Sequence, residues 1–300
     1  MLTVSHRRGL TLVVLGVLCL VPDATSVRLA DVDGVTVVFW RGLFLAAAIV
    51  LYVRATTGPF WGAARGTGRL GAISALCIGV TNFLFVQAIE HTATANVLVI
   101  ISTAPLFAAG FSRLLLSERV HPRTVAAMTV ALGGVALAFS SSLDGTGLGG
   151  DLMAFATAAI VGLNLTVVRK AGGGPMIPAV ALGGVLSALL ALPAAWPVEI
   201  SLHDAAVIGT MGGILLPAAL ILITIGTGYL PAPEVGLVLI LETVLGPLMT
   251  WAVVGEEPPE LAVLGGTVVV VTLLAHSLAA LAEERRTLTP AVIASSRPST

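Results

Sequence analysis

Three ionisable side chains stand inside long apolar stretches of the sequence. Asp23 and Arg41 each lie a few residues from the end of such a stretch, and Glu242 lies near the middle of another. Charged groups in membrane helices pair with one another or face a water-filled cavity, and they mark substrate pathways and proton relays. If the stretches cross a bilayer, these residues predict a polar site within a helical bundle.

Asp23 and Arg41 are expected at the same depth. Asp23 lies about six residues before the end of its stretch and Arg41 about seven after the start of the next, so both sit roughly 10 Å below one surface at about 1.5 Å per residue. This predicts an ion pair, either a structural staple between two buried charges or a gate or site for a charged substrate group. Pro22 removes a backbone donor and predicts a kink beside Asp23.

Glu242 lies near the expected midplane, where its side chain cannot easily reach either surface. Such a carboxyl group must be neutral, paired or wetted by a cavity. One interpretation is proton coupling or binding of a substrate cation. The alternative is a structural acid that pairs with Arg41 or with a polar group on a neighbouring helix.

Uncharged polar residues occur at similar depths in other stretches. Asn82, Ser102 and Asn164 lie mid-way along theirs, and Asn96 lies nearer one surface. Each can serve as a hydrogen-bonding link between helices. Together with the charged groups they predict a cavity lined by Asp23, Arg41, Asn82, Asn96, Ser102, Asn164 and Glu242.

The composition places the chain in a bilayer. Hydrophobic residues make up 57% and charged residues 10%, against about 25% charged in soluble domains, and the mean hydropathy is +1.03. The expected partners are therefore the lipid bilayer and a small-molecule substrate, not nucleic acid. No Walker loop, HExxH, GxSxG, dinucleotide fingerprint or His/Cys cluster occurs, so we expect no catalytic residue, metal site or cofactor.

Apolar stretches of roughly 20 residues predict membrane-spanning helices. Ten segments qualify, and a longer loop rich in Gly, Thr and Arg is expected over about 55–69. The predicted spans are 9–29, 34–53, 70–89, 94–116, 122–141, 150–168, 175–197, 204–226, 232–254 and 260–282.

Positive charges are retained on the cytoplasmic side of a membrane. With ten alternating spans and a cytoplasmic N-terminus, nearly all basic residues fall on that side, whereas Arg28 falls outside and Arg41 lies within a helix. The sequence thus predicts a multi-pass protein with both termini cytoplasmic. Its single lysine, against fourteen arginines, and its many Ala, Gly and Val residues favour a bacterial inner membrane.

The layout of the two halves is repeated. The segment Thr94–Glu118 aligns with Ala232–Glu256 at a shift of 138 positions without a gap, although few residues are identical. Five helices per half is an odd number, so the second half enters the membrane upside down, a common build of secondary transporters. We expect two inverted five-helix repeats over 9–141 and 150–282 and a disordered cytoplasmic tail over 283–300.

The sequence resembles the EamA-type members of the drug/metabolite transporter superfamily. The resemblance rests on WRG at Trp40–Gly42, on Thr94 to Val120 with its closing SERV, and, in the second half, on GDLMAF at Gly150–Phe155 and the run Pro233–Pro258. It implies ten helices around a central cavity and transport of a small organic solute. One departure is Thr243, which follows Glu242 where many members have proline.

We therefore expect an all-α membrane protein that works as a secondary transporter by alternating access. Its solute would be a metabolite, amino acid or drug-like compound, moved with export as the default direction and with proton coupling as an addition. An intramembrane lipid-modifying enzyme and a non-transporting structural protein are the alternatives. Whether the protein forms a homodimer is left open by the sequence.

Overall fold

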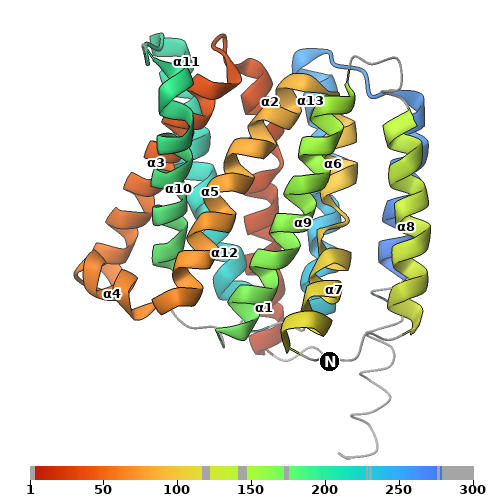
Figure 1. Cartoon of the computed structure of the whole chain (residues 1–300), viewed down its shortest axis with the longest axis horizontal. Coiled ribbons are helices and arrows are strands. Elements are labelled where there is room, and N and C mark those ends of the chain that lie inside the picture. Colours follow the sequence, from red (N-terminus) through yellow and green to blue (C-terminus); the bar gives the residue numbers. More distant parts are fainter. Residues whose placement is uncertain are drawn as a thin grey trace, which may run out of the picture.

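A computed structural model describes residues 4–116, 122–140, 147–171, 176–196, 198–227, 229, 232–275 and 278. These residues form helices joined by short connections, and no strand occurs among them. Most helices run along one direction of the bundle, with the N-terminus at one end and α11 at the other (Figure 1). The labelled helices are α1 (Val4–Leu20), α2 (Pro22–Leu29), α3 (Gly34–Thr56), α4 (Phe60–Gly66), α5 (Gly68–His91), α6 (Thr94–Ile101), α7 (Ala104–Leu116), α8 (Pro122–Ser140), α9 (Leu148–Lys170), α10 (Ile177–Ala195), α11 (Leu202–Thr210), the π-helix η1 (Met211–Leu215), α12 (Leu216–Thr227) and α13 (Ala232–Val254).

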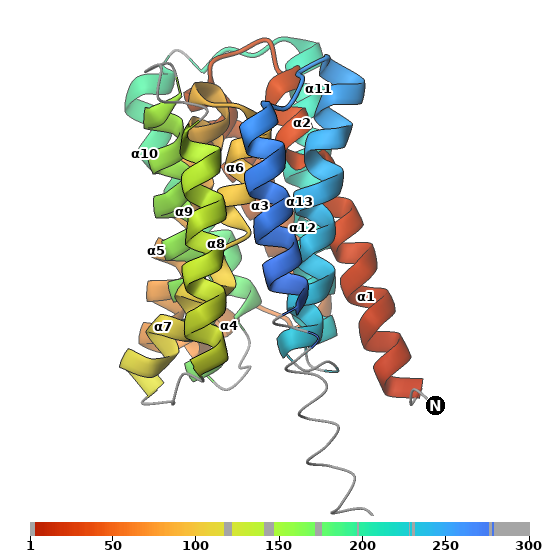
Figure 2. The same ribbon diagram turned by 90° about the vertical axis from the view of Figure 1, so that its right-hand side faces the viewer.

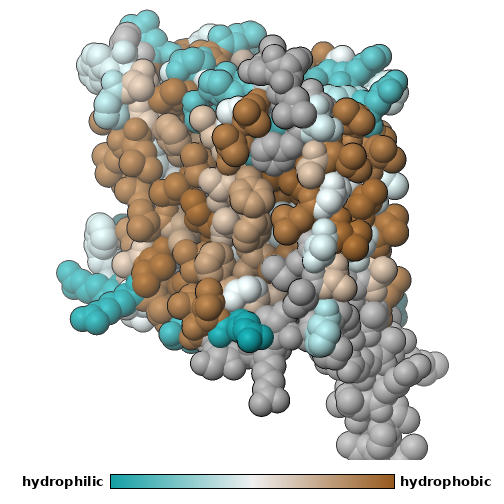
Figure 3. All heavy atoms as spheres, turned by 45° about the vertical axis from the view of Figure 1, so that its right-hand side comes forward, coloured by the Kyte–Doolittle hydropathy of each residue, from teal (hydrophilic) through white to brown (hydrophobic). Residues whose placement is uncertain are grey.

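On the face shown in Figure 3, apolar side chains form a band across the bundle, and hydrophilic ones gather at its two ends. Seven helical stretches in the described residues are long and apolar enough to cross a membrane. Three shorter apolar helices, Thr129–Ala138, Leu241–Val254 and Glu260–Ala275, coincide with the fifth, ninth and tenth predicted spans. The prediction of an all-α, multi-pass membrane protein is confirmed, while the count of ten spans stays a prediction.

Prolines interrupt two of the spans but not a third. Helix α1 ends at Leu20 and α2 begins at Pro22, whose missing amide hydrogen suits a first helical position. Helices α6 and α7 are likewise separated at Ser102–Thr103, just before Pro105. Pro247, in contrast, lies inside α13, which continues through that residue.

The loop predicted over 55–69 is wrong in part, because it contains α4 and the start of α5. Gly58, with a backbone φ of 107°, makes the turn that ends α3, and α4 begins directly after Pro59. Phe60 is only 8% exposed and packs in a cluster with Leu45 and Ile49 of α3. This buried aromatic anchors a short helix that composition alone presents as a loop.

Glycines allow three close approaches between helices. A Cβ added to Gly42 of α3 would lie 2.5 Å from the Gly184 carbonyl oxygen of α10, and one added to Gly184 would lie 2.6 Å from the Gly42 carbonyl oxygen. Gly134 of α8 faces Gly265 of the helix Glu260–Ala275 in the same reciprocal way. These two helices lie together at one edge of the bundle (Figure 2). Gly212 of η1 approaches the backbone of Arg41, since a Cβ added to this glycine would lie 3.0 Å from the Arg41 carbonyl oxygen.

Neighbouring glycines of α8 provide a matched test of this packing. Gly134→Ala should lower the free energy of unfolding by about 1–3 kcal/mol, because its methyl group would overlap the Gly265 carbonyl oxygen. Gly133→Ala meets nothing within 4 Å and should be neutral or stabilising by up to about 1 kcal/mol, since alanine favours helix. Thermal unfolding in detergent measures both, and equal effects would contradict the assigned packing.

Candidate substrate site

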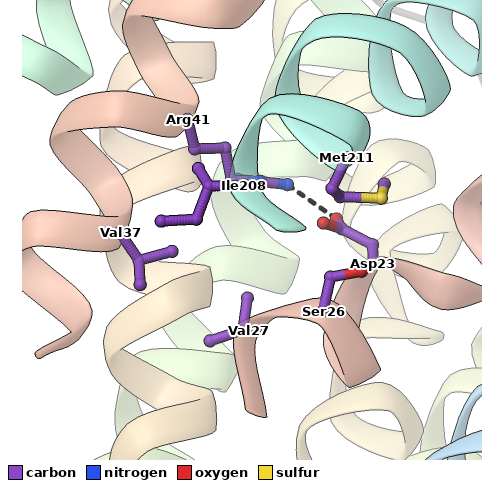
Figure 4. A pocket seen from close by; sticks show the side chains of 7 residues that line it. All are labelled: Asp23, Ser26, Val27, Val37, Arg41, Ile208 and Met211. Carbon is purple, nitrogen blue, oxygen red and sulfur yellow. Dashed lines mark hydrogen bonds and ion pairs between the residues drawn. The ribbon is translucent and has the colours of Figure 1, made fainter. Parts of the chain in front are cut away.

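The predicted ion pair between Asp23 and Arg41 is present in the structure. Arg41 Nη2 lies 2.6 Å from Asp23 Oδ2, and the two side chains come from α2 and α3 (Figure 4). Asp23 is 5% exposed and Arg41 is 4% exposed. The first turn of α2 thus presents a carboxylate to the guanidinium of the adjacent span, within the apolar bundle.

A small cavity adjoins the pair. Its free volume, ≈ 10 Å³, corresponds to roughly one water molecule. Apart from the ion pair, the walls are mainly apolar and come from α2, α3, α11 and η1; the lining residues are Ser26, Val27, Val37, Ile208 and Met211 (Figure 4). The Phe85 ring of α5 covers the guanidinium, with 5.5 Å from Arg41 Cζ to the ring centroid.

The ion pair leaves three buried polar atoms without a hydrogen-bond partner among the described residues: Asp23 Oδ1, Arg41 Nε and Arg41 Nη1. A buried donor or acceptor that lacks a partner destabilises a fold by about 1–3 kcal/mol, and more if it is charged. One acceptor and two donors therefore stay available beside a cavity. A ligand that carries both an acceptor and a donor would satisfy them.

The π-helix η1 forms one wall of this site. Met211 at its start lines the cavity, and Gly212 packs on the Arg41 backbone. Single π-turns inside α-helices are uncommon and occur often at functional sites. Here the turn lies between α11 and α12 within one apolar stretch, Leu202–Gly226. The two small residues Gly212 and Gly213 permit η1 to approach α3 at the level of the ion pair.

Glu242 reaches the same region from α13. Its side chain is partly buried, and it lies close enough to Asp23 for their charges to interact. Helix α13 is held against α2 by the hydrogen bond between the hydroxyl groups of Thr25 and Thr250, 2.9 Å apart. Glu242 is not among the residues that line the cavity beside the ion pair.

Ser102 lies at the level of Glu242. Helices α6 and α13 are antiparallel, since Thr94 at the start of α6 bonds Glu256 just beyond α13. Leu98 packs on Gly246, so one turn further along each helix places Ser102 and Glu242 at matching depth. The α6–α7 break at Ser102 is thus level with the acid, and the Ser102 hydroxyl caps the Val99 carbonyl 2.7 Å away.

The three asparagines predicted for the cavity each link helices. Asn82 of α5 donates to Ser187 Oγ of α10 at 2.8 Å, next to Gly42 and so close to Arg41. Asn164 of α9 accepts from Ser74 of α5 at 2.7 Å. Asn96 of α6 is 1% exposed and donates to Asp151 of α9 at 3.3 Å. Asn82 adjoins the ion pair, whereas Asn96 and Asn164 belong to separate polar links, and a cavity role for them stays a prediction.

Sequence reasoning missed three side chains that shape this region, and it missed Asp151 in the separate link to Asn96. Phe85 follows Asn82 by three residues on α5, and Met211 precedes the Gly212–Gly213 pair, so each had a nearby signal. Ser187 had no such signal in the sequence, because its role depends on how α5 and α10 pack together. Asp151 stands in the GDLMAF motif; it is fully buried and accepts from the Thr92 hydroxyl at 2.7 Å.

The architecture defines a polytopic α-helical membrane protein with a buried pair of opposite charges. Residues 7–140 match the family model described as the EamA-like transporter family, which confirms the resemblance noted in the sequence. Comparison with curated proteins gives no match. A solved chain, described only as the crystal structure of a protein, is 18% identical with a TM-score of 0.63, over 93% of this chain and 99% of that one. That likeness establishes a shared fold.

Removing one partner of the ion pair should destabilise the protein far more than removing both. Asp23→Leu or Arg41→Met alone leaves an uncompensated buried charge and should lower the free energy of unfolding by about 3–5 kcal/mol, whereas the double variant should lie near the parent. Thermal unfolding measures the cycle, with Arg54→Met, an exposed arginine of the same helix, as the control. Additive losses in the double variant would show that the two charges are not coupled.

Proposed function

We propose that this protein is a secondary transporter that moves a small organic solute across the membrane by alternating access. The observation that carries the proposal is the buried Asp23–Arg41 pair, whose three unpartnered polar atoms adjoin a cavity within an apolar bundle. Polar groups retained at such depth mark substrate and ion pathways. The match of residues 7–140 to a transporter family supports the same conclusion.

The proposal includes two inverted five-helix repeats, over 9–141 and 150–282. The reciprocal glycine contacts support it, because Gly42 meets Gly184 and Gly134 meets Gly265 in the same manner from both sides. A two-fold axis makes a contact self-complementary in this way. The packing of α1 on α12 and of α5 on α9 agrees as well, since these pairs exchange under the proposed repeat.

In this proposal the α4 end of the bundle is cytoplasmic and the α11 end faces outward. Arg54, Arg65 and Arg69 gather on α3, α4 and the start of α5, as expected for the side that retains positive charge. The proposed location is a bacterial inner membrane with both termini inside. The two halves would rock about the region of Asp23 and Arg41, so that this region opens to each side in turn.

The proposed roles of the charged groups follow from their contacts. Arg41 offers two open donors to an anionic or carbonyl group of the solute, and Asp23 Oδ1 offers an acceptor. Glu242, within electrostatic reach of Asp23, is proposed to exchange a proton or a solute cation as the halves move. Ser102, at the α6–α7 break, offers a hydroxyl at the same depth as Glu242.

The stable double variant separates a binding role of the ion pair from a structural one. After a thermal-shift screen of the purified protein against metabolites, we expect flux of a stabilising solute into proteoliposomes to fall at least about tenfold in Asp23→Leu/Arg41→Met, since the atoms that would bind it are gone. Arg54→Met should transport normally. Undiminished flux in the folded double variant would show that the ion pair has a structural role only.

Glu242 can be tested by the response of transport to a pH gradient. In proteoliposomes with and without the gradient, Glu242→Gln should lose the effect of the gradient because an amide cannot carry the proton, whereas Glu242→Asp should retain part of it. Glu257→Gln, which removes an exposed acid, is the matched control. Full dependence on the gradient in Glu242→Gln would contradict proton coupling through this residue.

A further inference from the structure

A cluster of polar contacts ties the two halves of the chain together at the α11 end. Arg28, at the end of α2, pairs with Glu256 after α13, with 2.7 Å between Arg28 Nε and Glu256 Oε2. Arg28 Nη2 also donates to the Thr92 carbonyl oxygen at 2.7 Å. Arg28 therefore links the end of α2 both to the segment after α13 and to the backbone before α6.

Glu256 also caps the start of α6. The Thr94 amide donates to Glu256 Oε1 at 2.6 Å, and the Thr94 hydroxyl donates to Oε2 at 3.2 Å. A carboxylate at a helix N-terminus satisfies a free backbone N–H and interacts favourably with the helix dipole. A single carboxylate thus joins three elements: the end of α2, the start of α6 and the segment after α13.

A second link lies nearby, between the α2–α3 connection and α11. The Asp31 amide donates to Asp204 Oδ1 at 2.8 Å, and His203 Nε2 lies 3.4 Å from the Leu29 carbonyl oxygen. Asp204 is held in place by the Ser201 hydroxyl, which donates to Oδ2 at 2.6 Å. The end of α2 and the connection after it are therefore bonded to two parts of the second half of the chain: the segment after α13 and helix α11.

These links lie directly beyond the candidate substrate site. Arg28 follows Asp23 by five residues on one helix, a rise of roughly 7.5 Å. Val27, which lines the cavity, immediately precedes it. The Arg28–Glu256 pair is partly exposed, at 24% and 22% of the side-chain surface, whereas Asp23 and Arg41 beneath it are buried. The charged links thus separate the site from the solvent at this end.

We infer that Arg28, Glu256 and Thr94 form a gate that closes the α11 end of the transport path. The inference rests on the proposed transport function, and it assigns the closed state of this end to the present structure. Opening would require the Arg28–Glu256 pair and its bonds to Thr92 and Thr94 to separate, so that α2 moves away from α6 and α13. The Asp31–Asp204 link reinforces the closed arrangement.

The gate can be tested by the accessibility of the site, without a known solute. In the full-length chain with Cys19 and Cys77 replaced by alanine, Val27→Cys places a thiol in the cavity wall. A membrane-impermeant maleimide is applied to membrane vesicles of either orientation. Labelling from the α11 side should be slow in this parent and about tenfold faster after Arg28→Ala or Glu256→Gln, because the closed state loses its charged links.

Two further variants keep the result decisive. Glu257→Gln removes the neighbouring exposed acid and should leave the labelling rate unchanged, whereas Thr94→Val, which removes one hydroxyl, should give a smaller rise even if Arg28→Ala fails to fold. Unchanged rates in the folded Glu256→Gln and Thr94→Val variants, or rapid labelling of the parent, would overturn the gate. Because the assay reads opening alone, a failure of the transport proposal would not alter its outcome.

Discussion

A bilayer offers no water to a buried polar group, and the internal contacts of this bundle follow from that constraint. Serine and threonine hydroxyls bond carbonyl oxygens of the preceding turn, as Thr103 does to Ile100 at the α6–α7 break. Polar side chains that face other helices find partners there, as in Ser74–Asn164 and Asn82–Ser187. Against this pattern the unpartnered atoms of Asp23 and Arg41 are an exception. An apolar pair of similar volume would pack at least as well, so the retention of these charges needs a reason other than stability.

The position of Arg41 shows how the fold supports such a site. Its own helix is packed closely on α10 through Gly42, the residue directly after it, while Gly212 brings η1 against its backbone. Phe85 covers the guanidinium from α5. The arginine is therefore fixed by three neighbours, whereas its partner Asp23 stands at the start of a short helix that Pro22 separates from α1. A rigid cation and an anion on a separate segment suit a site whose two sides move apart.

The sequence was sufficient for the charged part of the site and insufficient for its walls. A charged residue within an apolar stretch can be recognised from the sequence around it. The depth of a residue in each of two consecutive helices follows from the rise per residue. Asp23, Arg41 and their pairing were therefore predictable. The roles of Phe85, Met211 and Ser187 depend on how helices rotate and pair. The same limit applies to the partners of Asn96 and Asn164, which are Asp151 and Ser74 on other helices. Helix α4 was missed because its stability comes from Phe60 packing on α3.

The two proposed halves differ most where they should correspond. At the shift of 138 positions Glu242 aligns with Ala104, the first residue of α7, and the Ser102–Thr103 break aligns with unbroken helix in α13. One half thus interrupts its helix at the level where the other carries an acid, and the antiparallel packing of α6 on α13 sets the two features at matching depth. In the proposed transporter, a scaffold with exchangeable halves would provide two similar conformations that open to opposite sides of the membrane. A solute and a proton need distinct binding groups, and the asymmetric pairing of a helix break with Glu242 would supply them at the one level that both conformations share.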